Sequence, residues 1–134
     1  MQLDTYLFFN GDCEAALALY QAAFGAQITT LVRFRDAPEG ANILAEWQDK
    51  IMHGSITLGD QTLMGADIAP EQYETPKGFS ISLQIKSTAD AERIFQDLAK
   101  EGRVVMPLEK TFWAERFGMV VDRFGIPWLI NCEG

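Results

Sequence analysis

The stretch FSISLQIKSTADAERIFQDLAKEGRVVM, residues 79–106, decides the fold because it predicts a strand, a helix and another strand in close succession. Its first seven residues alternate between apolar and polar side chains, which is typical of a half-buried strand. The apolar residues expected on one face of this strand are Phe79, Ile81, Leu83 and Ile85.

The helix of this stretch is predicted to begin at residues 87–90, where the sequence STAD has the pattern of a capping box. Apolar side chains then recur at positions i, i+3, i+4 and i+7, which gives the helix one buried stripe. The residues of this stripe are Ala91, Ile94, Phe95 and Leu98. Gly102 is predicted to end the helix before the next strand.

The same order of elements occurs earlier in the chain, at an offset that aligns Glu14-Ala15 with Asp90-Ala91. Residues 5–9, TYLFF, predict a strand, and Asp12 is predicted to cap the following helix through its carboxylate. The stripe of this helix is expected to contain Ala16, Leu19, Tyr20 and Ala23. Gly25 is predicted to end it, and residues 27–35, QITTLVRFR, predict the next strand.

Each half then continues into a predicted β-hairpin. Residues 52–67, MHGSITLGDQTLMGAD, alternate around Gly59-Asp60, a two-residue turn signal. Residues 119–131, MVVDRFGIPWLIN, are expected to turn between Asp122 and Gly125, with Pro127 opening the last strand and Trp128 in the core facing the helix.

These patterns predict an α+β fold built from paired β-α-β-β-β modules in a single domain, residues 1–134. Module one covers about residues 1–68 and module two about residues 78–134. Since one module cannot cover both faces of its own sheet, the pair is expected to form an open-barrel mixed sheet with helices on the outer face. The concave face would line a cleft for a ligand.

The composition excludes several classes of protein. The net charge of −8 repels nucleic-acid phosphates and anionic membranes, so neither is a predicted partner. No stretch approaches the roughly 20 apolar residues of a membrane span, and the first residues lack the pattern of a signal peptide. The only cysteines are Cys13 and Cys132, which predicts free thiols and a cytoplasmic location. Cys13, near a helix start, either has a lowered pKa or packs as an apolar side chain.

Three stretches resemble the PhnB-like branch of the vicinal oxygen chelate superfamily, which includes glyoxalase I, extradiol dioxygenases and bleomycin-resistance proteins. They are YLFFNGDCEAALALYQAAFGA, HGSITLGDQTLMGAD and TFWAERFGMVVDRFGIPWLIN, so the resemblance runs from end to end. It implies a small organic ligand and a homodimer. Some such proteins are described as demethylubiquinone methyltransferase-like, but the chain has no glycine-rich loop for S-adenosylmethionine.

The resemblance also implies four metal-ligand positions, one from a strand of each quarter of the cleft. In this chain they are expected at Thr5, Met64, Ser80 and Leu129. Methionine and leucine cannot serve a hard divalent cation, and hydroxyl groups are weak ligands for one. The sequence therefore predicts no metal and no other cofactor.

His53, the single histidine, is the candidate catalytic residue. Strand alternation is expected to place it in the cleft with Ser55 and Thr57. There it is either a general base or hydrogen-bond donor, or an ordinary half-buried histidine bonded to backbone or water. A displaced metal site would need carboxylates near it, and the candidates for this are Glu46, Asp67 and Glu109.

Other side chains are candidate ligand contacts. Phe112, Trp113 and Phe117 are expected to wall an aromatic pocket, with core packing an equal alternative for Trp113. Arg33 and Arg35 are expected to point to one side, either to bind an anion or to decorate an exposed strand. Residues 36–50 and 67–78 contain three of the five prolines and are predicted to be loops over the cleft mouth.

The sequence therefore predicts a small-molecule-binding protein that lacks the usual metal site of its relatives. The alternative is an enzyme, a lyase, isomerase or dioxygenase-like protein that uses His53 with a carboxylate on a small oxygenated or phosphonate-like substrate. The predicted ligand-binding residues around His53 are Thr5, Asp67, Ser80, Phe112 and Trp113.

Overall fold

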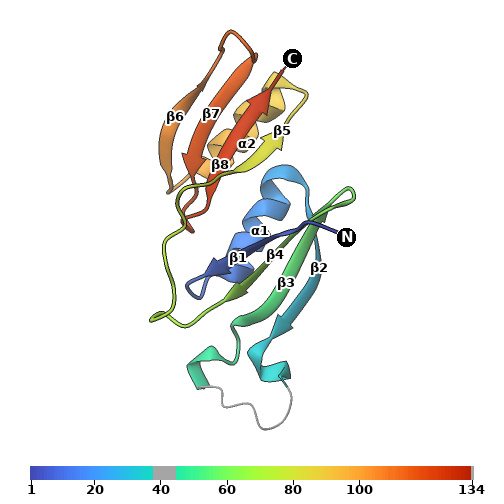
Figure 1. Ribbon diagram of the computed structural model, residues 1–134, viewed down its shortest axis with the longest axis vertical. Helices are drawn as coiled ribbons and strands as arrows, with labels where there is room; N and C mark the ends of the chain where they lie inside the picture. The colour runs from blue at the N-terminus through green and yellow to red at the C-terminus, as the bar shows by residue number, and fades with distance from the viewer. Residues whose placement is uncertain (38–44, 134) are drawn as a thin grey trace. The chain divides into compact units, whose positions relative to one another are not determined.

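The computed structural model describes residues 1–37 and 45–133, so the part of the predicted 36–50 loop that covers residues 38–44 lies outside the described residues. The fold is α+β, as predicted. The chain divides into two compact units, unit 1 (Met1–Tyr73) and unit 2 (Glu74–Gly134), each with one long helix and one four-stranded mixed sheet (Figure 1).

Unit 1 has the order β-α-β-β-β. Its sheet has the strand order β1-β4-β3-β2, in which β1 and β4 are parallel and the other neighbours are antiparallel. Two 3-10 turns, Phe34–Asp36 and Ala45–Trp47, flank the residues outside the description. The elements are β1 (Thr5–Phe9), α1 (Cys13–Phe24), β2 (Gln27–Arg33), β3 (Ile51–Leu58) and β4 (Gln61–Asp67).

Helix α1 lies where the sequence predicts it, but two details of the prediction are wrong. Leu17 is fully buried while Leu19 is only half-buried, so the apolar stripe is turned toward Leu17. Asp12 precedes the helix without a side-chain cap; instead, Oδ1 of Asp67 accepts the hydrogen bond from the Cys13 amide at 2.8 Å. Gly25 ends the helix with φ +78°, as expected.

Helix α1 packs so closely on its sheet that two strand positions have no room for a side chain. A Cβ at Gly54 would lie 2.9 Å from the Leu17 side chain, and one at Gly65 would lie 2.9 Å from the Phe9 ring. The positions of β1 that face α1 are Leu7 and Phe9, both buried. These residues identify the helix-covered face of the sheet, and Figure 1 shows α1 lying against that one side.

Unit 2 repeats this topology with the strand order β5-β8-β7-β6, and β5 and β8 are its parallel pair. The predicted strand at residues 79–85 is shorter in the structure, and Phe79 is exposed before it begins. The elements are β5 (Ile81–Gln84), α2 (Thr88–Ala99), β6 (Arg103–Glu109), β7 (Arg116–Val121) and β8 (Pro127–Cys132).

Helix α2 confirms the predicted stripe: Ala91, Ile94, Phe95 and Leu98 are its buried residues. Ser87 caps its start, because the Ser87 hydroxyl accepts from the Asp90 amide at 3.2 Å. Helix α2 ends at Ala99, just before Gly102, and the residue in the left-handed conformation is Glu101, with φ +61°. Glycine is needed at 102 because a Cβ there would lie 2.3 Å from the carbonyl oxygen of Val121.

The β7-β8 turn is held by the carboxylate of Asp122, which is 3% exposed. Its Oδ1 accepts from the amides of Phe124 and Ile126, and its Oδ2 accepts from the indole nitrogen of Trp128 at 2.9 Å. Trp128 is buried in the unit-2 core, as predicted. In the part of the chain that the structure describes, no helix is long and apolar enough to span a membrane.

Candidate functional site

The side of the unit-1 sheet opposite α1 is called here the helix-free face. Side chains alternate along a strand, so residues between the helix-facing positions point to this face. Tyr6 and Phe8 alternate with the buried Leu7 and Phe9 on β1, and His53 precedes Gly54, which faces α1. Ser55 and Met64 are partners across β3 and β4 on the same side. Tyr6, Phe8, His53, Ser55 and Met64 therefore define the helix-free face.

Tyr6 and His53 form a hydrogen-bonded pair on this face. The distance from Tyr6 Oη to His53 Nδ1 is 3.0 Å, and the two rings are stacked with centroids 5.7 Å apart. The Phe8 ring lies 5.3 Å from the Tyr6 ring. Tyr6 is 39% exposed and Phe8 is 50% exposed, so the group forms a preorganised aromatic surface that a ligand can reach.

The hydrogen bond between Tyr6 and His53 determines which imidazole nitrogen can bind a ligand. Burial, and then the nearby Cys13 thiol, raise the pKa of Tyr6 above its ordinary value, which keeps the hydroxyl protonated at neutral pH. When Nδ1 of His53 accepts, the Tyr6 hydroxyl is the donor of this bond, since a phenol donates more strongly than it accepts. The imidazole proton is then on Nε2, which has no hydrogen-bond partner among the described residues. The pair thus supplies one fixed N–H donor beside two aromatic rings.

The prediction that Thr5 lies beside His53 is wrong, because strand alternation places Thr5 on the helix-covered side with Leu7. Tyr6, one residue further on, is the β1 residue that pairs with Met64 on the helix-free face. The sequence alone does not indicate this choice of face, because residues 6–9 are apolar at both alternating positions; the burial of Leu7 and Phe9 decides it.

In unit 2 the corresponding strand residue lies two positions after the predicted one, on the same face. Ser80 lies before β5, outside the strand. Ser82 is the β5 residue that pairs with Leu129 of β8, and both alternate with the residues that face α2. Next to Ser82, the Gln84 amide donates to its hydroxyl at 2.8 Å and accepts from Asn131 at 2.7 Å.

The residues at the four superfamily metal positions do not fit a divalent metal. After the register correction, unit 1 offers Tyr6 and Met64, and unit 2 offers Ser82 and Leu129. These are a phenol, a thioether, a hydroxyl and a hydrocarbon, which are not the imidazole and carboxylate ligands that such ions take. Among residues 1–37 and 45–133, no three His, Cys, Asp or Glu side chains gather as ligands.

Asp67, predicted as a ligand contact near His53, has a structural position instead. It is 3% exposed on the helix-covered side. Its two oxygens accept from the amides of Cys13, at 2.8 Å, and Ile51, at 2.9 Å. Burial raises the pKa of Asp67 above its ordinary value, against the effect of these two amides. Asp67 is therefore not the carboxylate partner that an enzymatic role for His53 requires.

Cys13 is buried beside Asp67 and behaves as an apolar side chain. Burial, then the negative charges of Asp67 and Glu14, raise the pKa of its thiol to about 12. The alternative of a lowered pKa at the helix start is therefore wrong, because desolvation and neighbouring carboxylates outweigh any effect of the helix N-terminus.

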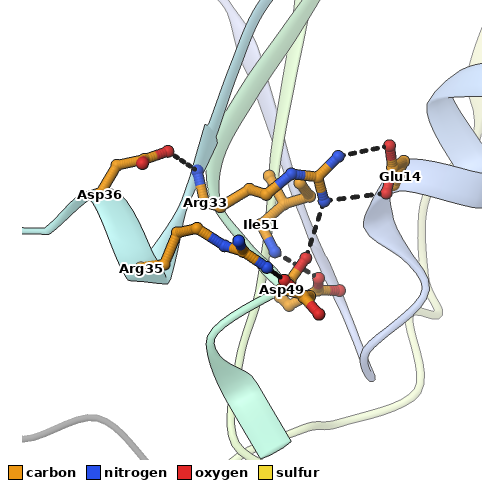
Figure 2. Close-up of polar contacts among 7 residues, drawn as sticks. Glu14, Arg33, Arg35, Asp36, Asp49 and Ile51 are labelled. Atoms are coloured by element: carbon orange, nitrogen blue, oxygen red, sulfur yellow. Dashed lines mark hydrogen bonds and ion pairs between the residues drawn. The ribbon is translucent and has the colours of Figure 1, made fainter. Parts of the chain in front are cut away.

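Arg33 and Arg35 do not form a paired anion site (Figure 2). Arg33, the last residue of β2, makes two hydrogen bonds to the Glu14 carboxylate, at 2.8 and 3.0 Å, and one to the Asp49 carbonyl. Arg35 lies in the following 3-10 turn and pairs with the Asp49 carboxylate. The predicted alternation ends at Arg33 because β2 ends there.

Phe112, Trp113 and Phe117 gather in unit 2, and their role as the wall of an aromatic pocket stays a prediction. Trp113 is perpendicular to the other two rings, with centroids 4.7 Å from Phe112 and 5.3 Å from Phe117. The Thr111 hydroxyl fixes the turn by accepting from the amides of Trp113 and Ala114. Phe112 is 97% exposed and Trp113 is 52% exposed, so Trp113 is not a core residue of unit 2.

The fold and these residues can now be compared with known proteins. A sequence profile of the Glyoxalase/Bleomycin resistance protein/Dioxygenase superfamily matches residues 2–130, and the chain belongs to this superfamily. Protein YjdN of Escherichia coli (strain K12) is 34% identical over 139 residues, which cover 98% of this chain and 95% of YjdN.

Solved structures agree with this assignment. Protein PA1353 of Pseudomonas aeruginosa is 46% identical, with a TM-score of 0.89 over 99% of this chain and 98% of PA1353. The PhnB protein of Bacillus cereus has a TM-score of 0.83 at 22% identity, over 98% of this chain and 99% of that protein, which supports the fold alone. The predicted resemblance to this superfamily is therefore confirmed, and a PhnB protein is among the structures that share the fold.

Proposed function

We propose that this chain is a small-molecule-binding protein whose ligand lies on the helix-free face of unit 1. The observation that carries the proposal is the Tyr6–His53 hydrogen bond, which is exposed on a sheet face next to Phe8. A solvated sheet face normally carries polar side chains. Two exposed aromatic rings around one oriented imidazole are instead typical of a ligand surface, where a few polar groups orient a mostly apolar contact.

A ligand suited to this face has an aromatic ring and an oxygen acceptor. The ring would pack on Phe8 and Tyr6, which contributes about 0.5–1.5 kcal/mol beyond the buried area. The oxygen would accept from Nε2 of His53, a hydrogen bond worth about 0.5–1.5 kcal/mol net. No catalytic step is part of the proposal, because the hydrogen-bond partner of His53 is the phenol of Tyr6.

Three residues of unit 2 stay predicted ligand contacts: Ser80, Phe112 and Trp113. The exposure of the two aromatic rings, and the Thr111 turn that holds them, support their inclusion. Each is to be tested by its own alanine substitution in the assay below.

The proposal is tested with 2-acetylnaphthalene, an uncharged aromatic ketone, by isothermal titration calorimetry. Phe8→Ala and His53→Ala should each weaken binding by roughly two- to tenfold. Leu58→Ala is the matched control, because Leu58 is 38% exposed at the end of β3 on the helix-covered side of the same sheet. Unchanged affinity in both face variants, or an equal loss in the control, would reject this site.

A further inference from the structure

We infer that the helix-free face of unit 1 selects an uncharged ligand and discriminates against anions, an inference that rests on the proposed function. The strands of unit 1 contain only two charged residues, Arg33 and Asp67. Both are directed toward α1: Arg33 bonds to Glu14 of the helix, and Asp67 bonds to the Cys13 amide. The helix-free face of this sheet therefore has no carboxylate, ammonium or guanidinium group on its strands.

The neutrality of this face contrasts with the rest of the chain. Charged residues make up 22% of the sequence, and a sheet face exposed only to water commonly carries them. Here the outward positions of β1 and β4 are aromatic or aliphatic at Tyr6, Phe8, Met64 and Ala66. Two polar groups of β3 are paired with neutral partners, since His53 bonds to Tyr6 and Ser55 bonds to Thr29 at 2.8 Å, and the third, Thr57, is an uncharged hydroxyl.

An anion would gain little and lose much on such a surface. The chain has a net charge of −8, so its field repels anions, and no cation on these strands compensates. A carboxylate or phosphonate would also give up its hydration without receiving a countercharge. The donors available on this face are uncharged: the imidazole N–H of His53 and the hydroxyls of Thr57 and Thr62, and they suit the carbonyl, ether or phenol oxygen of an uncharged aromatic molecule. Arg33, the cationic residue on the unit-1 strands, is held by two hydrogen bonds to Glu14 of α1 (Figure 2).

The test uses two probes with the same ring system, 2-acetylnaphthalene and 2-naphthoate, which differ in charge at neutral pH. Because the chain has a single histidine, the imidazole C–H resonances report His53 without ambiguity. The ketone should shift these resonances to saturation, and naphthoate should bind at least roughly tenfold more weakly. Met64→Lys adds a cation to the face, so it should reduce or reverse the preference for the ketone over naphthoate. Thr57→Lys is the second variant if Met64→Lys does not fold.

The outcomes separate the two claims. If neither probe shifts the His53 resonances, the proposed site itself fails. If naphthoate binds as tightly as the ketone, the site stands and the inference of an uncharged ligand is overturned. If the resonances shift on dilution without a probe, a second copy of the chain occupies the face, and the inference is again overturned.

Discussion

Replacing Asp67 by asparagine tests whether this buried carboxylate is a structural link or a ligand contact. Asp67 accepts one hydrogen bond with each oxygen, from Cys13 at the start of α1 and from Ile51 at the start of β3. An asparagine side chain has only one acceptor oxygen, so its NH₂ group would face the second backbone amide. One buried N–H would then lack a partner, which costs about 1–3 kcal/mol.

This loss should lower the melting temperature by roughly 4–12 °C, if each kcal/mol shifts the midpoint by about 4 °C in a domain of this size. Differential scanning calorimetry of Asp67→Asn measures it, with Asp60→Asn as the matched control, because Asp60 is exposed in the β3-β4 turn. The folded variant should bind 2-acetylnaphthalene with unchanged affinity. Weakened binding at an unchanged melting temperature would refute the structural assignment and restore Asp67 as a ligand contact.

Three further predictions concern other parts of the molecule. Hydrogen bonding to Arg33 lowers the pKa of Glu14, so Glu14 contributes stability above its unfolded pKa of about 4.3, and this is lost as the pH falls through its folded pKa. Glu14→Gln should therefore have a lower melting temperature than the wild type at pH 7 and the same melting temperature near pH 3. The decrease at pH 7 should be smaller than that of Asp67→Asn, because the Glu14–Arg33 ion pair is half exposed. An equal decrease in melting temperature at both pH values would contradict this. With a thiol pKa of about 12, Cys13 should resist iodoacetamide in the native protein at pH 8, and modification as fast as in urea would argue against it. We also propose a homodimer, because Val104, Val105 and Met106 are exposed on the edge strand β6; light scattering should give about twice 15.0 kDa, and a monomer at micromolar concentration would reject it.

The repeated order of elements was predictable because local signals are strong in this sequence. The stripe of α2 and the turn glycines Gly25, Gly59 and Gly125 depend on residues close in the chain, and all behave as predicted. The predictions for Asp12 and Asp67 were wrong for a non-local reason. The carboxylate that bonds to the start of α1 comes from the end of β4, 54 residues away, and no local pattern indicates it.

The candidate site was only partly predictable. His53 lies on the face that alternation predicts, but anchoring on the turns placed the β1 contact at Thr5, one residue from Tyr6. An error of one residue in the predicted position moves a side chain to the opposite face of a sheet. The same error matters little for a helix boundary, but in a strand it decides whether a residue can contact the ligand. The pairing of Arg33 with Glu14 was also hidden, because it depends on where β2 ends against α1.

The most direct test of the central claim is to locate a bound probe by intermolecular nuclear Overhauser effects. The complex of the full chain with 2-acetylnaphthalene should give contacts from the naphthalene protons to the rings of Tyr6 and Phe8, and from the acetyl methyl group to the imidazole of His53. Contacts confined to other residues, such as Leu58 on the opposite side of the sheet, or none at saturating probe, would contradict a ligand site on the helix-free face of unit 1.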